Sequence, residues 1–221
     1  MDSVATPTEL EKTAYHEVGH TLVAKLLGRT ITSIMLFHTK QTENWEGIAR
    51  NDPPSKIDSD WATLNLDQYI PYTEFQLHYP KYPELHEKYG AIREECIIKY
   101  AGWVTEALLY KQLGLDTLLI PSDESAADFQ FVSLLLQENF PPQDWKEELL
   151  QAENHTRKIL SNHLGWCMVE NLAKEIIDAI LHGKEPLRQD DQSEVFKFSH
   201  EMIYESFRQT LTTTIIETNF D

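Results

Sequence analysis

A run of five residues, His16-Glu-Val-Gly-His20, constrains the fold more than any other feature of the 221-residue chain. On a helix, two histidines four residues apart lie on the same face, and their Cβ atoms are about 5–6 Å apart. Two imidazoles at that spacing can share one metal ion, and zinc is the usual occupant of such a pair. The run therefore predicts a helix that carries part of a metal site.

The flanking residues predict where this helix begins and ends. Thr6 is a candidate N-cap, Pro7 fits the first helical position, and Glu9 is spaced to close a capping box. Gly28 is a natural terminator at the other end. Between these signals, apolar residues recur at near-helical spacing, at Leu10, Ala14, Val18, Leu22 and Leu26. The two histidines are therefore expected in the middle of a well-supported helix.

Glu17 lies between the two histidines, and we expect it to act in the reaction rather than to hold the metal. It sits about 100° round the helix from His16, beside the ion. From there its carboxylate can take a proton from a water molecule on the metal, whose pKa zinc lowers from 15.7 to about 7. This arrangement is typical of a metallopeptidase, in which Glu17 is the general base.

A hydrolytic zinc site needs a third protein ligand, and the spacing leaves several candidates. One group of zinc enzymes places a third histidine six residues after the second, but that position is Leu26 here. A second arrangement takes a glutamate from a downstream helix, for which Glu94, Glu95 and Glu106 are available. A third arrangement takes an aspartate much further along the chain. Spacing alone does not choose between the last two.

Three blocks of the sequence resemble the peptidase domain of the FtsH-type zinc peptidases. Residues 15–24, Tyr-His-Glu-Val-Gly-His-Thr-Leu-Val-Ala, are similar to the metal helix of that family, which is close to A-Y-H-E-A-G-H-A-x-V-A. Residues 100–110 resemble its A-G-R-A-A-E-E-L helix, and residues 125–133 resemble the segment that supplies its third zinc ligand. With a weaker similarity over 152–187, the resemblance covers most of residues 8–187.

The resemblance implies a ligand set and a reaction. His16 and His20 would bind Zn²⁺ with Asp128 as the third ligand, and Glu106 would support one of the ligands. Glu17 would be the general base in the hydrolysis of peptide bonds, and the substrate would be a polypeptide, with unfolded chains as one class. The alternative for Asp128 is a solvated carboxylate near a helix start, where the helix dipole stabilises acidic residues.

A zinc-binding but proteolytically silent regulatory or binding module is the alternative function. Trp103 and Ala107 stand where the family has Arg and a second Glu, so the polar contacts of that helix differ. The intact His16, Glu17 and His20 oppose the alternative, because a silent module has no physical need for the glutamate.

The surroundings of the resembling segment also differ from the family. Its members normally carry an AAA+ ATPase and membrane segments ahead of the peptidase domain, whereas seven residues precede Thr8 here and no P-loop motif is present. We therefore expect a free-standing domain that binds no ATP and acts without it. A partner ATPase acting in trans and a homodimer remain alternatives.

Composition argues against several other classes of protein. The net charge of −17 opposes binding to nucleic acid, which needs clustered Lys and Arg. The longest apolar runs, such as residues 34–37, are far shorter than the 18 or so residues of a membrane span, and no signal peptide opens the chain. Two cysteines point to a reducing compartment, so a soluble, cytoplasmic protein without membrane contact is expected.

The remaining pattern predicts a mainly α-helical α+β fold with a small β-hairpin, in which a zincin-like metal helix packs in a helical bundle. Residues 31–37 predict a buried strand that pairs with 47–50. An edge strand beside a metal helix can hold an extended substrate by main-chain hydrogen bonds. The candidate substrate-binding strand is therefore formed by Ile34, Met35, Leu36 and Phe37; alternatively, the hairpin only covers one face of the helices.

The second half of the chain predicts helices. Residues 51–90, rich in Pro and Tyr, predict an irregular insert, for which a lid over the cleft is one hypothesis. Helices are then expected at 91–112, 125–138, 143–163, 167–182 and 191–213. The peptidase-like domain would thus span residues 1–187, and residues 188–221 would form a C-terminal helical extension.

Overall fold

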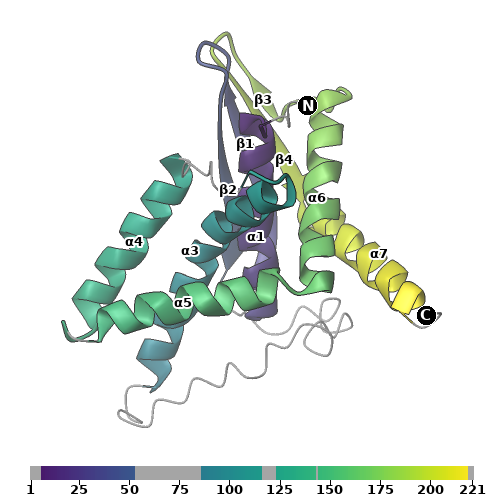
Figure 1. Cartoon of the computed structure of the whole chain (residues 1–221). Helices are drawn as coiled ribbons and strands as arrows, with labels where there is room; N and C mark the ends of the chain where they lie inside the picture. The colour runs from purple at the N-terminus through teal and green to yellow at the C-terminus, as the bar shows by residue number, and fades with distance from the viewer. Residues whose placement is uncertain (1–5, 53–85, 116–122, 143, 219–221) are drawn as a thin grey trace.

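The computed structural model describes residues 6–52, 86–115, 123–142 and 144–218. This part of the chain is mainly helical and contains a four-stranded antiparallel sheet, which confirms the α+β prediction (Figure 1). The elements in chain order are α1 (Glu9–Leu26), β1 (Thr30–Thr39), β2 (Asn44–Asp52), α3 (His86–Gln112), α4 (Asp123–Asn139), α5 (Trp145–Leu160), α6 (His163–Leu181), β3 (Arg188–Gln189), β4 (Ser193–Ser199) and α7 (His200–Thr218).

Helix α1 begins at a capping box two residues later than the sequence predicted. Thr8, not Thr6, is the N-cap: its side chain accepts a hydrogen bond from the N–H of Glu11, and the Glu11 carboxylate accepts one from the N–H of Thr8. Both polar contacts satisfy donors that a helix start leaves open. The helix ends at Leu26, and Gly28 follows with φ 76°, a conformation that favours glycine.

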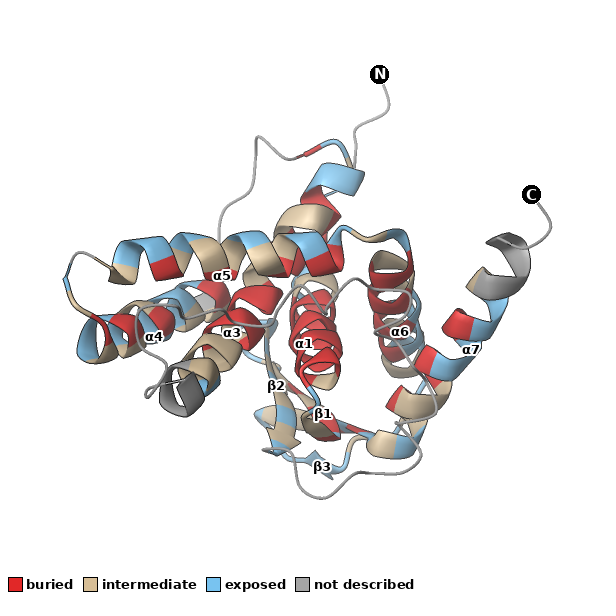
Figure 2. Cartoon of the chain, turned by 90° about the horizontal axis from the view of Figure 1, so that it is seen from below, coloured by how far each residue is buried: buried red, intermediate tan, exposed pale blue. Residues whose placement is uncertain are grey.

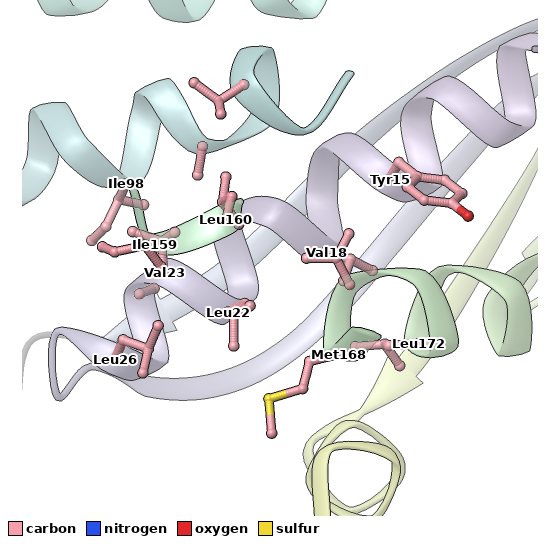
Figure 3. Packing of buried hydrophobic residues seen from close by; sticks show 14 of the residues in the cluster. Tyr15, Val18, Leu22, Val23, Leu26, Ile98, Ile159, Leu160, Met168 and Leu172 are labelled. Carbon is pink, nitrogen blue, oxygen red and sulfur yellow. The ribbon is translucent and has the colours of Figure 1, made fainter. Parts of the chain in front are cut away.

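Helix α1 is the central element of the fold. Every residue from Thr13 to Ala24 is buried, because α3, α6 and the sheet pack around the helix (Figure 2). Val18 and Leu22 belong to the same apolar cluster as Met168 and Leu172 of α6 (Figure 3). Polar side chains on so enclosed a helix need partners inside the protein.

The sheet has the strand order β2-β1-β4-β3, so the predicted hairpin is only part of it. β1 and β2 pair as expected, with Leu36 opposite Gly47. β4 pairs with the other side of β1, with Ser33 opposite Ser199. The helix predicted over 191–213 and the helical extension predicted over 188–221 are therefore wrong in their first parts, where the chain forms β3 and β4.

The physical reason for this correction is the period of the apolar residues in β4. Phe196 and Phe198 are buried, whereas Lys197 between them is exposed. An alternation of period two places both rings on the core face of a strand. The stripe that suggested a helix continues only beyond Ser199, where α7 begins.

The central position of β1 corrects a second prediction. Ile34, Met35, Leu36 and Phe37 are each paired with β2 on one side and with β4 on the other. A strand can take up a further chain only through unpaired main-chain groups, so β1 cannot be the substrate-binding edge. The edge strand of this sheet next to α1 is β2.

The insert predicted at about 51–90, to which the lid hypothesis refers, lies largely outside the described residues. Within the described ranges, residues 51–52 end β2 and residues 86–90 begin α3. Across the helices that the structure describes, none combines the length and apolar character that a membrane crossing requires.

Candidate metal centre

The structure brings the three predicted metal ligands together. The Nε2 atoms of His16 and His20, on successive turns of α1, are 2.9 Å apart. Oδ2 of Asp128, on α4, is 3.3 Å from Nε2 of His16 and 2.8 Å from Nε2 of His20. Three potential ligand atoms from two helices thus converge on one point.

The other ring nitrogen of each histidine is held by an acceptor. Nδ1 of His16 is 2.7 Å from the Glu106 carboxylate, and Nδ1 of His20 is 2.5 Å from the main-chain carbonyl of Ile98. Because carbonyl and carboxylate oxygens accept hydrogen bonds, both Nδ1 atoms are assigned as donors. In the neutral rings, both Nε2 atoms then direct lone pairs toward Asp128, which is how metal-binding histidines are usually oriented.

Glu106 lies where a residue that supports a ligand is expected. It is fully buried in the middle of α3, and its Oε1 atom also accepts a hydrogen bond of 2.5 Å from the hydroxyl of Ser125. The second contact fixes the carboxylate that in turn fixes His16. Glu94 and Glu95, the other glutamates considered, instead lie 3.6 and 3.8 Å from the guanidinium of Arg29.

The electrostatics of the centre favour a positive charge at the point of convergence. Burial by itself would lower the pKa of His16, but its hydrogen bonds to Asp128 and Glu106 outweigh burial and raise that pKa to about 10. Burial would raise the pKa of Asp128, but hydrogen bonds to His16 and His20 hold it well below its usual range. Without a metal, the centre therefore retains a proton that a cation could replace.

Glu17 is buried beside the two histidines. Its carboxylate oxygen and the two ring nitrogens lie within 4.8 Å of one another, so these three residues could also hold an ion. Asp128 is the better third ligand, because a single oxygen of its carboxylate is at hydrogen-bond distance from both Nε2 atoms. Oε2 of Glu17 is buried and has no hydrogen-bond partner among the described residues. Its carboxylate is thus available for a proton transfer.

Two glycines make room for these side chains, and the sequence analysis did not single them out. A Cβ atom added at Gly102 of α3 would lie 2.6 Å from Cδ2 of His16 and closer still to two other atoms of that ring. A Cβ atom added at Gly47 of β2 would lie 2.8 Å from Cδ and Oε1 of Glu17. The pair Ala101-Gly102 gave no distinguishing signal in the sequence, because the same helix contains a second small pair, Gly90-Ala91.

The metal centre opens into a cleft of about 720 Å³. One wall is formed by residues of α1, α3 and α4, and the other by β2. The lining residues contributed by β2 are Gly47, Ile48, Ala49, Arg50, Asn51 and Asp52. The cleft therefore has potential metal-ligating side chains on one wall and a β-strand on the other.

Two more residues of the cleft were missed by the sequence analysis. Lys99 donates a hydrogen bond of 2.8 Å to Oδ1 of Asp128, the oxygen that does not face the histidines. Glu124 accepts a hydrogen bond of 2.5 Å from the N–H of Gly47. Burial raises the pKa of Glu124 to about 8, and nearby Glu17 adds to the effect while His16 opposes it. Neither residue stands in a pattern that distinguishes it from other surface charges of these helices.

No known family model, curated protein or solved structure matches this chain. The resemblance to FtsH-type peptidases therefore stays a prediction, and the functional argument depends on the geometry of the cleft.

Proposed function

We propose that this protein is a zinc-dependent metallopeptidase that hydrolyses peptide bonds in polypeptide substrates without ATP. One observation carries the proposal: the lone-pair atoms of His16, His20 and Asp128 converge beside the buried Glu17. In the absence of a cation the cluster keeps a proton, as the raised pKa of His16 indicates, and a metal ion would take the place of that proton.

The donor set suits Zn²⁺. Two imidazoles and a carboxylate are a common ligand set for catalytic zinc. At bond lengths of about 2.0–2.1 Å, the ligand atoms of a tetrahedral zinc ion are roughly 3.3 Å apart. The corresponding distances here are 2.8, 2.9 and 3.3 Å, so small outward shifts would accommodate the ion. Bound zinc would act as a Lewis acid toward the scissile carbonyl and would lower the pKa of a water molecule.

Residues of the chain would transfer the proton and hold the ligands in their orientations. Glu17 would accept the proton of the attacking water and pass it to the leaving amine. Glu106 and the Ile98 carbonyl would hold the two imidazoles in their orientations, and Lys99 would orient the Asp128 carboxylate. Each of these contacts is present before substrate binds, which reduces the reorganisation that the reaction requires.

The open edge of β2 would bind the substrate, in place of the β1 residues suggested by the sequence. β2 is an edge strand, and its residues line the cleft next to Glu17. An extended peptide could add to this edge through main-chain hydrogen bonds, which do not depend on the peptide's side chains. This mode suits an enzyme that acts on unfolded chains of varied sequence.

The test is cleavage of fluorescein-labelled casein by the zinc-loaded protein in buffer free of ATP. We expect cleavage that a chelator abolishes and added zinc restores. Glu17→Gln should keep one zinc per chain and lose turnover by about 10²–10⁴-fold, the usual contribution of a general base. Cleavage that survives the chelator or Glu17→Gln would contradict the proposal. Bound zinc without chelator-sensitive cleavage would instead favour the silent module.

A further inference from the structure

One main-chain N–H group on β2 faces away from the rest of the sheet. Successive N–H groups of a strand point alternately to its two sides. The N–H of Gly47 donates to Glu124 of α4, so it faces away from β1 and toward the open edge of the sheet. By the same alternation, the N–H of Ala49 also faces the open edge. These two groups are donors that an added strand would use.

Gly47 is the part of β2 that lies against the proposed general base. A Cβ atom added there would lie 2.8 Å from Cδ and Oε1 of Glu17. Gly47, Glu17 and Asp128 all line the same cleft. The N–H of Gly47 is therefore the edge donor beside the reacting atoms, where the carbonyl of a substrate residue next to the scissile bond would bind.

The side chain of Glu124 already accepts a hydrogen bond from the N–H of Gly47. It lies one helical turn before Asp128 on α4, so both side chains are on the face of the helix that borders the cleft. The N–H of Gly47 is the only hydrogen-bond donor that Glu124 contacts within the described ranges, and no ion pair of those ranges includes it. A side-chain oxygen held by a single neutral donor can be displaced by another acceptor.

We infer that Glu124 is a gate on the substrate-binding edge of β2. Its side-chain oxygen accepts the hydrogen bond of the Gly47 N–H, and a substrate carbonyl must displace this oxygen in order to bind there. This inference rests on the proposed function, because it assumes that a peptide adds to β2. Gating predicts that Glu124 weakens substrate binding, since the bond between Glu124 and Gly47 is lost when the peptide binds. A residue that positioned β2 for catalysis would have the opposite effect, because its removal would loosen the site.

The experiment compares Glu124→Ala and Glu124→Gln with the parent, and uses Glu138→Ala, an exposed glutamate on the same helix, as a matched control. Binding of fluorescein-labelled casein is measured by polarisation in zinc-loaded Glu17→Gln protein, so that no cleavage disturbs the reading. KM and kcat are measured separately in protein that retains Glu17. Zinc content and thermal unfolding establish that each variant is folded.

For Glu124→Ala we expect both Kd and KM to fall by about three- to tenfold, with kcat within about twofold of the parent, the size of effect that one released hydrogen bond allows. Glu124→Gln keeps an oxygen that can accept from Gly47 and should remain close to the parent, as should Glu138→Ala. The amide proton of Gly47 should exchange with solvent faster in Glu124→Ala.

A rise in Kd or KM in Glu124→Ala, or a fall in kcat with KM unchanged, would overturn the gate and assign Glu124 to positioning. Equal binding in all four proteins, or no binding in any, would overturn it as well. Because binding is measured without cleavage, the gate can fail while zinc-dependent cleavage persists. An uncleaved substrate that still binds more tightly to Glu124→Ala would contradict the peptidase and leave the gate standing.

Discussion

The two walls of the cleft differ in what they offer. On the helical wall, formed by α1, α3 and α4, the groups that face the centre are side chains, and those of His16, His20 and Asp128 are each held by a further partner. On the strand wall, formed by β2, the group nearest Glu17 belongs to the main chain, because Gly47 presents no side chain at all. Metal binding needs fixed side chains, whereas binding of varied peptides needs a backbone edge. From this difference we expect changes to the helical wall to alter metal affinity, and changes to the strand wall to alter substrate binding or turnover while metal affinity stays the same.

Asp128→Ala should have the largest effect, because it removes the proposed third ligand from the helical wall. We expect the dissociation constant for zinc to rise by more than about 100-fold, beyond the loss usual for a residue that only supports a ligand. Competition with a fluorescent zinc chelator measures this constant. Glu138→Ala on the same helix is the control, and a normal zinc affinity in Asp128→Ala would remove Asp128 from the centre.

Gly102→Ala tests whether close packing of α3 fixes the first imidazole. Alanine is the better helix former by about 1 kcal/mol, so the helix itself should not suffer. The added Cβ atom would overlap with the ring of His16, however, and the ring must move. We expect zinc affinity to fall by about 100-fold, while circular dichroism shows an unchanged helix content. Unchanged zinc affinity would mean that the ring is not held in this position.

Glu106→Gln should weaken zinc binding by about 10- to 100-fold, the range found when a partner of a histidine ligand is changed. The amide preserves the size of the side chain but lacks the negative charge that stabilises the Nδ1–H of His16. Ser125→Ala removes the hydrogen bond to Glu106 and a longer contact of 3.4 Å with Nδ1 of His16, but it leaves the Glu106 carboxylate in place and should have a smaller effect in the same titration. A larger loss for Ser125→Ala than for Glu106→Gln would reverse the roles assigned to them.

Gly47→Ala probes the strand wall. The new methyl group would displace the carboxylate of Glu17, so turnover should fall by about tenfold or more, in line with the sensitivity of catalysis to small misplacements. Zinc affinity should stay at the parent value, because the three atoms nearest to the added Cβ all belong to Glu17, which is not one of the proposed ligands. Loss of zinc in this variant would break the distinction between the two walls.

Ile48→Ala should have the smallest effect. The side chain of Ile48 is exposed at the cleft and can contribute only apolar contact to a bound peptide. We expect KM to rise by about two- to fivefold, which corresponds to the partial loss of a few buried CH₂ groups. Zinc affinity and kcat should remain unchanged, and a strong fall in kcat would show that this part of β2 does more than contact the substrate.

The two ends of the chain show how far local pattern can predict the fold. The helix around His16 and His20 was predicted because capping residues, apolar period and terminating glycine all act within a few turns. The strand β4 was missed because its short alternation around Phe196 and Phe198 was merged with the apolar stripe of α7. Pairing with β1, more than 150 residues earlier, decided its conformation. The position of β1 inside the sheet was hidden for the same reason.

The sequence by itself determined the spacing of His16, Glu17 and His20, because one helical turn fixes where their side chains point. It offered Glu106 only as one of three downstream glutamates and chose Asp128 only through a resemblance, since nothing local ties α3 and α4 to α1. The tertiary structure decided which carboxylates meet the imidazoles and which strand edge stays open. Those choices depend on the packing of distant elements, and contacts such as that of Glu124 with Gly47 leave no periodic signal in the chain.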